Sequence, residues 1–144
     1  MTAPDLPAMT GEEETLADLW ATATYGVHPI EHIRAPLTAW GVLSAAGVRD
    51  AKDQTTATVA GLVTHRQRPP TARGVVFMSL EDETGMVNVI CPPQVWDAHK
   101  KMASVAPALL IGGRIERNGD AVNLVAERLR PLKAPATVPS RDFR

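Results

Sequence analysis

The sequence contains a single cysteine, few aromatic residues and no long apolar run. With only Cys91, the chain cannot form an intrachain disulfide, and it lacks the second thiolate that most structural zinc sites require. No apolar stretch is long enough to cross a bilayer, and no segment has the pattern of a secretory signal peptide. We therefore expect a protein of the reducing cytoplasm that does not contact the membrane.

The sequence also lacks a recognisable catalytic or metal-binding cluster. One short run, Glu81–Glu83, is acidic and lies before Gly85 in a predicted turn. Aspartate in a turn commonly accepts hydrogen bonds from backbone amides, so we expect this run to cap the turn and stay solvated. The histidines lack the spacing of a zinc site; they are His28, His32, His65 and His99. We expect no catalytic residue, no bound metal and no cofactor.

The net charge of -1 hides an uneven distribution. Residues 1–58 hold three Lys and Arg against eight Asp and Glu, whereas no acidic residue occurs between Gln54 and Leu80. That acid-free stretch contains His65, Arg66, Arg68 and Arg73. Guanidinium groups match phosphate oxygens and release counterions on binding, so the stretch is a candidate phosphate-binding patch.

The first 55 residues have the pattern of a helical segment that precedes a domain. We expect residues 1–11 to be a disordered start and residues 12–55 to be a helical segment that packs on the domain after it. Thr10 can cap a first helix with an acidic first turn. That helix should end at His28–Pro29, because proline disfavours helix at the preceding residue.

A second short helix is predicted over residues 30–40, restarted at Pro36. Gly41 and Gly47 then indicate a loop. Two tryptophans, Trp20 and Trp40, are expected to lie in the core that joins these helices to the domain.

Residues 56–132 change to the period-two alternation of strands, which predicts a mainly β domain. The expected strands run from Thr56 to before Pro69 and over Val75–Leu80, Met86–Cys91, Leu109–Glu116 and Ala121–Leu129. Gly85 and the Asn118–Gly119 pair supply the tight turns. A helix opened by Pro92 and Pro93 and running to Met102 separates the third strand from the fourth.

Five strands with a helix between the third and fourth are the order of the OB-fold barrel. Its ligand face lies on strands two and three, with the loops joining strands one to two and four to five at the rim. We expect Trp96, on the inserted helix, to plug one end of the barrel, and Cys91 to be a small packed residue.

Several motifs resemble a known family. They are Gly61–Val63 with the following basic loop, Phe77–Gly85, Leu110–Ile115 and Asn123–Ala126. Together they resemble the OB-fold family shared by anticodon-binding domains and bacterial replicative polymerase α subunits. The motifs Thr64–Pro69, Leu80–Val89, Asn123–Leu129 and Ser140–Arg144, with Tyr25–Pro29 upstream, resemble the C-terminal end of error-prone C-family DNA polymerases.

The resemblance implies that this chain is a fragment of a polymerase that copies damaged DNA with the accessory proteins of a mutagenic complex. Polymerase chemistry requires clustered carboxylates that hold two magnesium ions, and no such palm segment is present in the sequence. We therefore expect this fragment to bind single-stranded DNA rather than to act as an enzyme.

Phe77 is the first candidate for stacking on a base, as the matching aromatic does in anticodon-binding relatives. If Met78 and Leu80 fill the barrel, strand alternation turns Phe77 and Ser79 toward the ligand face; the alternative is that Phe77 is core and Met78 is exposed. The rim candidates for contact with nucleic acid are His65, Arg66, Arg68, Arg73, Arg114, Arg117 and Asn118.

A competing hypothesis is a protein-interaction module that docks the polymerase onto accessory proteins, because OB barrels also bind proteins. The basic tail over residues 133–144 differs from the barrel in composition, and we expect it to be flexible. As a fragment, the chain is expected to be monomeric.

Overall fold

The structure is a computed structural model that describes residues 28–132, apart from the side chain of Ala72. The expected disordered start, the first helix with Trp20 and the basic tail lie outside the described residues.

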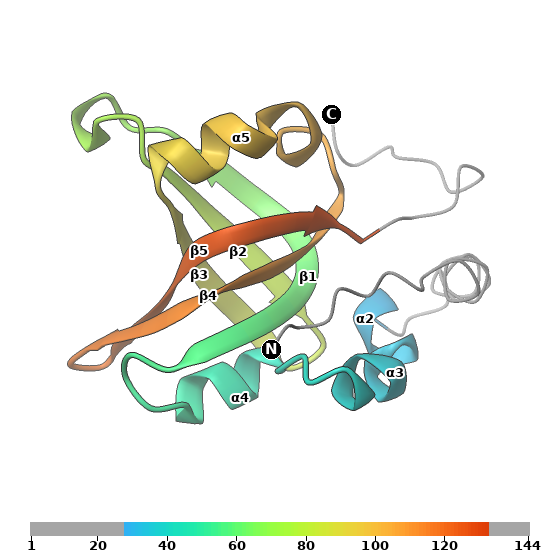
Figure 1. Ribbon diagram of the computed structural model, residues 1–144. Coiled ribbons are helices and arrows are strands. Elements are labelled where there is room, and N and C mark those ends of the chain that lie inside the picture. Colours follow the sequence, from blue (N-terminus) through green and yellow to red (C-terminus); the bar gives the residue numbers. More distant parts are fainter. Residues whose placement is uncertain (1–27, 133–144) are drawn as a thin grey trace.

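Five strands close into a barrel in the order β1-β2-β3-β5-β4 (Figure 1). They are β1 (Thr56–Gln67), β2 (Val76–Asp82), β3 (Gly85–Cys91), β4 (Ala108–Asn118) and β5 (Ala121–Pro131). All neighbours are antiparallel except β3 and β5. The helix α5 (Pro93–Ala103) lies between β3 and β4 in sequence and covers one end of the barrel. The prediction of a mainly β OB-fold with this inserted helix is confirmed.

The barrel interior follows directly from strand alternation. Met78 and Leu80 on β2 are 2% and 1% exposed, and Val87 and Val89 on β3 face them inside the same core. Trp96 of α5 joins this core, as expected for a plug. Cys91 is fully buried, and burial raises the pKa of its thiol to about 11.

β1 continues past the point at which its alternation of buried and exposed residues stops. Its register with β2 shifts between Val63 and His65, which marks a bulge. A bulge adds one residue to a strand and breaks the period of two, so the pattern in the sequence stops before the strand does. His65 and Arg66 lie in β1, within the strand predicted from Thr56 to before Pro69, and not in the basic loop expected after Val63.

Three short helices lie at the barrel end opposite to α5: α2 (Pro29–His32), α3 (Arg34–Ala39) and α4 (Ala45–Asp50) (Figure 1). Ile30 and Leu37 form a second apolar cluster with Leu110 of β4, and Trp40 packs against it. The described part of the expected helical segment, from residue 28 onward, therefore packs on the barrel.

The loop predicted around Gly47 is wrong, because Gly47 lies inside α4. The first amides of α4 all find acceptors: Ala45 N donates to Asp82 Oδ2, Ala46 N to Thr84 Oγ1, and Gly47 N to Ser44 Oγ. Satisfying these amides stabilises a helix start. Two of the three acceptors come from the β2–β3 turn, so the residues next to Gly47 in the sequence do not reveal them.

The β2–β3 turn is also where the helical segment is tied to the barrel. Asp82 is 5% exposed, and its Oδ1 accepts hydrogen bonds from Thr84 N at 2.7 Å and Gly85 N at 3.1 Å. Arg34 Nη2 lies 3.0 Å from Asp82 Oδ2 and 2.9 Å from Glu83 Oε1, and Arg34 Nε lies 2.7 Å from Glu83 Oε2. We call this group, Arg34 with Asp82 and Glu83, the junction.

The predicted capping role of the acidic run is thus confirmed for Asp82. The prediction that the run stays solvated is wrong for Asp82, and the Glu83 side chain is only 14% exposed. Arg34 reaches these carboxylates from nearly fifty residues earlier in the chain and covers them. Gly85 closes the turn with φ +147°, in the region that favours glycine.

Asp82→Ala should destabilise the fold strongly. It leaves Arg34 without one of its two carboxylates and the amides of Ala45 and Gly85 without acceptors. Breaking a buried ion pair from one side costs about 3–5 kcal/mol, and urea unfolding would measure this loss. The control is Glu81→Ala, a change to the half-exposed neighbour that should cost no more than about 0.5 kcal/mol. Equal losses for both variants would contradict the junction's role.

Glu83 should make the free energy of unfolding decrease as the pH falls into the acid range. The hydrogen bond from Arg34, supported by its charge, holds the pKa of the Glu83 carboxyl below its ordinary value of 4.5. Because the folded pKa is the lower one, this stabilisation is complete above about pH 4.5 and is lost as the pH falls through the folded pKa. The free energy of unfolding of wild type should therefore exceed that of Glu83→Gln near neutral pH and converge with it in acid.

The matched control introduces Glu83→Gln into an Arg34→Gln background. There, the effect of Glu83→Gln on the free energy of unfolding should lose most of its pH dependence, because the arginine that lowers the carboxyl pKa is gone. An effect that stays constant into strong acid in the wild-type background would contradict this assignment.

Candidate nucleic-acid interface

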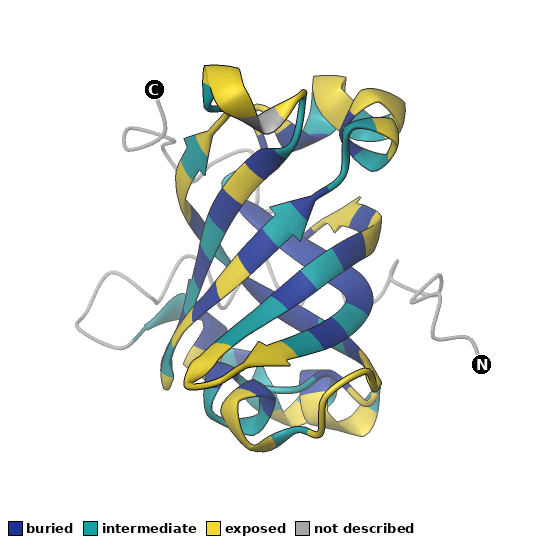
Figure 2. Ribbon diagram, turned by 90° about the vertical axis from the view of Figure 1, so that its left-hand side faces the viewer, coloured by how far each residue is buried: buried dark blue, intermediate teal, exposed yellow. Residues whose placement is uncertain are grey.

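The outer face of β1, β2, β3 and β5 is hollowed by a groove of about 390 Å³, which we call the sheet groove. Figure 2 shows buried residues alternating with intermediate or exposed ones along strands of this face, and the burial of β2 and β3 follows that alternation residue by residue. The outward side chains that line the groove are His65, Gln67, Phe77, Ser79, Asn88, Ile90 and Asn123.

Strand register arranges these side chains in two rows. His65, Ser79, Asn88 and Asn123 are paired in succession across β1, β2, β3 and β5 and form a polar row. Gln67, Phe77, Ile90 and Val125 are paired in the same way and form a mainly apolar row beside it. Directly opposed residues lie on the same face of a sheet. The groove therefore offers apolar surface for a flat ring along one side and hydrogen-bonding groups along the other.

Phe77 is the aromatic residue of this surface. Its side chain is 38% exposed, whereas its neighbour Met78 is 2% exposed and points into the barrel. The prediction that Phe77 faces outward is confirmed, and the alternative that Met78 is exposed is wrong. A phenyl ring held open to solvent on a β-sheet is suited to stacking on a nucleobase.

The other side chains of the groove were only partly predicted from the sequence. His65 and Ser79 are candidates that the structure places in adjacent positions of that row. Asn88 and Asn123, together with Ile90 in the second row, were missed. Alternation along β3 carried the signal, since Asn88 and Ile90 lie out of phase with the buried Val87 and Val89.

Arg66 has an internal role. Its Nε donates to Ala103 O at 2.9 Å and its Nη2 to Ala106 O at 2.5 Å. These carbonyls lie at and just beyond the C-terminal end of α5, where helix carbonyls lack internal partners. Burial lowers the pKa of the Arg66 guanidinium. Arg66 thus fastens α5 to β1.

Arg68 and Arg73 flank the connection between β1 and β2, which contains the short 3₁₀ helix η2 (Pro70–Ala72). Both side chains are exposed, and neither makes an ion pair with any residue from 28 to 132. These two cations remain available to an anionic ligand at this rim.

The rim between β4 and β5 is mostly occupied by internal contacts. Arg114 pairs with Glu116 at 3.0 Å and lies 3.8 Å from Glu127. Arg117 donates to Arg49 O at 2.6 Å and to Ala51 O at 3.0 Å. Asn118 is exposed beside the hairpin turn, where Gly119 has φ +66°.

Within residues 28–132, no cluster of three or more His, Cys, Asp or Glu side chains could hold a metal ion. The same part of the chain contains no helix long and apolar enough to cross a membrane.

The comparisons with known proteins identify a family of nucleic-acid-binding domains. The sequence model of the family described as OB-fold nucleic acid binding domain matches residues 57–132. The error-prone DNA polymerase of Mycobacterium tuberculosis strain H37Rv is 49% identical over 142 residues, which are 98% of this chain and 13% of that protein. The error-prone DNA polymerase of Nocardia farcinica is 46% identical over 143 residues, 99% of this chain and 12% of that protein. The chain thus spans about an eighth of these relatives.

Solved structures share the fold at low sequence identity. Asparaginyl-tRNA synthetase from Pyrococcus horikoshii, complexed with asparaginyl-adenylate, superposes with a TM-score of 0.55 at 17% identity over 68% of this chain and 24% of that chain. The OBody AM3L09 bound to hen egg-white lysozyme gives a TM-score of 0.52 at 16% identity over 66% of this chain and 97% of that chain.

Arg66→Ala should lower stability, because hydrogen bonds from a charged donor contribute about 1.5–3 kcal/mol and two carbonyls lose their partner. Arg68→Ala is the matched control, with an exposed side chain whose loss should change stability by no more than about 0.5 kcal/mol. Thermal and urea unfolding would compare the two. Equal stability of both variants would show that the contacts of Arg66 do not hold α5.

Proposed function

We propose, from the premise that this chain belongs to the OB-fold nucleic acid binding family, that its sheet groove binds single-stranded DNA within an error-prone DNA polymerase. In such a polymerase the domain would hold the single strand near the template during translesion, mutagenic repair synthesis. We assign this part of the polymerase a binding role and not a catalytic one.

The observation that carries the proposal is the position of Phe77. Its exposed ring lies in the groove between Gln67 and Ile90 in one row and beside the polar row that includes Ser79 and Asn88. A base stacked on the ring would bring its polar edge toward Ser79 and Asn88. Stacking tolerates any base, which suits a polymerase that copies varied and damaged templates.

The cations at the rim support the same ligand. Arg68 and Arg73 are exposed next to the end of the groove and are free of ion pairs with other described residues. Phosphate oxygens are suitable partners for such guanidinium groups. His65 can contribute from the polar row, and Asn118 from the opposite rim. Arg66, Arg114 and Arg117 have internal partners, so we assign them a smaller share of the binding.

Replacing Phe77 should separate stacking from mere apolar contact. Phe77→Ala and Phe77→Leu should each weaken binding of labelled single-stranded DNA by roughly 5- to 150-fold, because one base stack contributes about 1–3 kcal/mol. Phe77→Tyr keeps an aromatic ring and should bind nearly as wild type does. Fluorescence anisotropy with the 144-residue chain would measure the dissociation constants.

Since Phe77 is exposed, these variants should unfold at the wild-type urea concentration, which serves as the control for folding. If Phe77→Leu bound as tightly as Phe77→Tyr, the groove would not be a stacking site. Retention of wild-type affinity by Phe77→Ala would remove the groove from the binding interface.

A salt series distinguishes DNA binding from docking onto accessory proteins of the polymerase. The logarithm of the DNA association constant should fall with the logarithm of salt concentration by about 0.7 per phosphate contact in a single strand. An apolar interface with a protein partner should show a much weaker dependence.

A further inference from the structure

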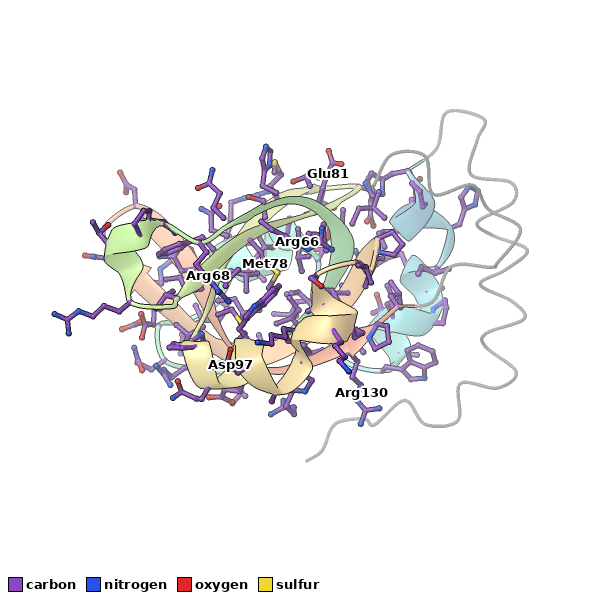
Figure 3. The ribbon with its side chains drawn as sticks, turned by 90° about the horizontal axis from the view of Figure 1, so that it is seen from above. Arg66, Arg68, Met78, Glu81, Asp97 and Arg130 are labelled. Carbon is purple, nitrogen blue, oxygen red and sulfur yellow. The ribbon has the colours of Figure 1, made fainter. Side chains whose placement is uncertain are left out.

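A second concave site lies between the end of β1 and α5, and we call it the α5 pocket. It has a volume of about 540 Å³. Gln67 lines both this pocket and the sheet groove, so the two hollows adjoin. Figure 3 views the barrel from the side covered by α5 and shows Arg66 and Arg68 beside that helix.

The α5 pocket is lined by four cationic residues and by no acidic one. Arg66 and Arg68 come from the end of β1 and the residue after it, and Lys100 and Lys101 come from the last turn of α5. Lysines at a helix C-terminus have an ordinary explanation, because they complement the helix dipole. That explanation does not cover the two arginines, which reach the pocket from another element. Cations brought together from separate elements favour an anionic ligand.

Most of this charge is uncompensated. Arg68, Lys100 and Lys101 are exposed and have no ion-pair partner in the described part of the chain. Asp97, on the same helix, makes no ion pair with them there either. Unpaired like charges repel one another, and a bound anion would relieve that repulsion.

Arg66 gives the pocket a fixed donor. Its Nε and Nη2 are held by the carbonyls of Ala103 and Ala106, while no acceptor among residues 28–132 bonds to its Nη1. A guanidinium that is already oriented loses little freedom when it binds phosphate.

The floor of the pocket is apolar. Trp96 and Val76 line it and are 7% and 2% exposed. A cationic rim above an apolar floor matches the chemistry of a nucleotide unit, in which charged phosphates are joined to a sugar and a base. A small inorganic anion would use the rim alone.

We propose that the α5 pocket binds phosphates of the single strand where that strand leaves the sheet groove past Gln67. This inference rests on the proposed function and adds a second, electrostatic part of the interface, supplied by Arg68, Lys100 and Lys101. The strand would thereby run from the outer face of the sheet onto the inserted helix.

The test uses the full chain and oligothymidylates of about 3, 6, 9 and 12 nucleotides, which extend from just below the smallest site of one OB-fold, about 4 nucleotides, into its range. Lys100→Gln/Lys101→Gln should weaken binding of the longer oligonucleotides by roughly 10-fold at low salt and reduce the salt slope by about 1.4, the value for two phosphate contacts. Binding of the shortest oligonucleotide, which occupies the groove alone, should be unchanged.

The matched control is Arg49→Gln/Lys52→Gln. It also removes two exposed cations, but these lie in α4 and the loop after it, at the opposite end of the barrel (Figure 1). The control should lower affinity only slightly and equally at every length, because distant exposed charges are screened.

The outcomes separate the two proposals. If Phe77→Ala weakens binding at all lengths but the lysine variant behaves like its control, the α5 pocket is not part of the interface and the proposed function stands. If Phe77→Ala has no effect on binding at any length, the proposed function fails, and the inference that rests on it fails too. An equal effect of the lysine variant at every length would also overturn the inference, because it would show attraction without a defined site.

Chemical shifts give an independent readout. The indole N–H signal of Trp96 should shift with the 12-nucleotide strand and not with the shortest one. Inorganic pyrophosphate is the comparison ligand. If pyrophosphate saturated the Trp96 shift while the 12-nucleotide strand left it unchanged, the pocket would be a site for free phosphate compounds, and the inference would be wrong.

Discussion

The junction of Arg34 with Asp82 and Glu83 is the constraint on which the arrangement of the molecule depends. It buries a carboxylate that closes the β2–β3 turn, starts α4 and holds α3 at the same time. A buried charge with so many partners admits few alternative positions, because each displaced partner would be left unsatisfied. The turn therefore fixes where β2 ends. Since a slip of one residue would reverse every side chain on the strand, it also helps to keep Phe77 outside and Met78 inside.

Some arginines of this protein are held by internal hydrogen bonds or ion pairs, and others are exposed to solvent. Arg34, Arg66 and Arg117 are held by carboxylates or carbonyls that complete the fold. Arg68 and Arg73 have no such partners among the described residues and are exposed. This division explains how a chain of net charge -1 can present a cationic rim. The total charge says little about the interface, because the acidic residues are concentrated elsewhere in the sequence.

Sequence patterns predicted those features that depend on neighbouring residues. Alternation indicated the five strands and placed Phe77 and Met78 on opposite faces of β2, but it did not decide which of the two faces outward; glycine indicated the turn at Gly85. Features created by distant contacts could not be predicted in this way. The helix around Gly47 depends on acceptors in the β2–β3 turn, and the partners of Arg66 lie some forty residues later. Such residues look like a loop glycine and a free arginine until the fold brings their partners to them.

The small binding free energy that the sheet groove can supply is suited to a domain of a larger protein. One aromatic ring supplies about 1–3 kcal/mol per stacked base, which alone corresponds to weak binding. The relatives that this chain matches are about eight times longer. Attachment to a protein that already holds the DNA raises the effective concentration of the strand to roughly millimolar for a short linker. Under the proposed function, a groove with a single stacking residue would then be sufficient to hold the strand, and it would also be weak enough to let the strand move on.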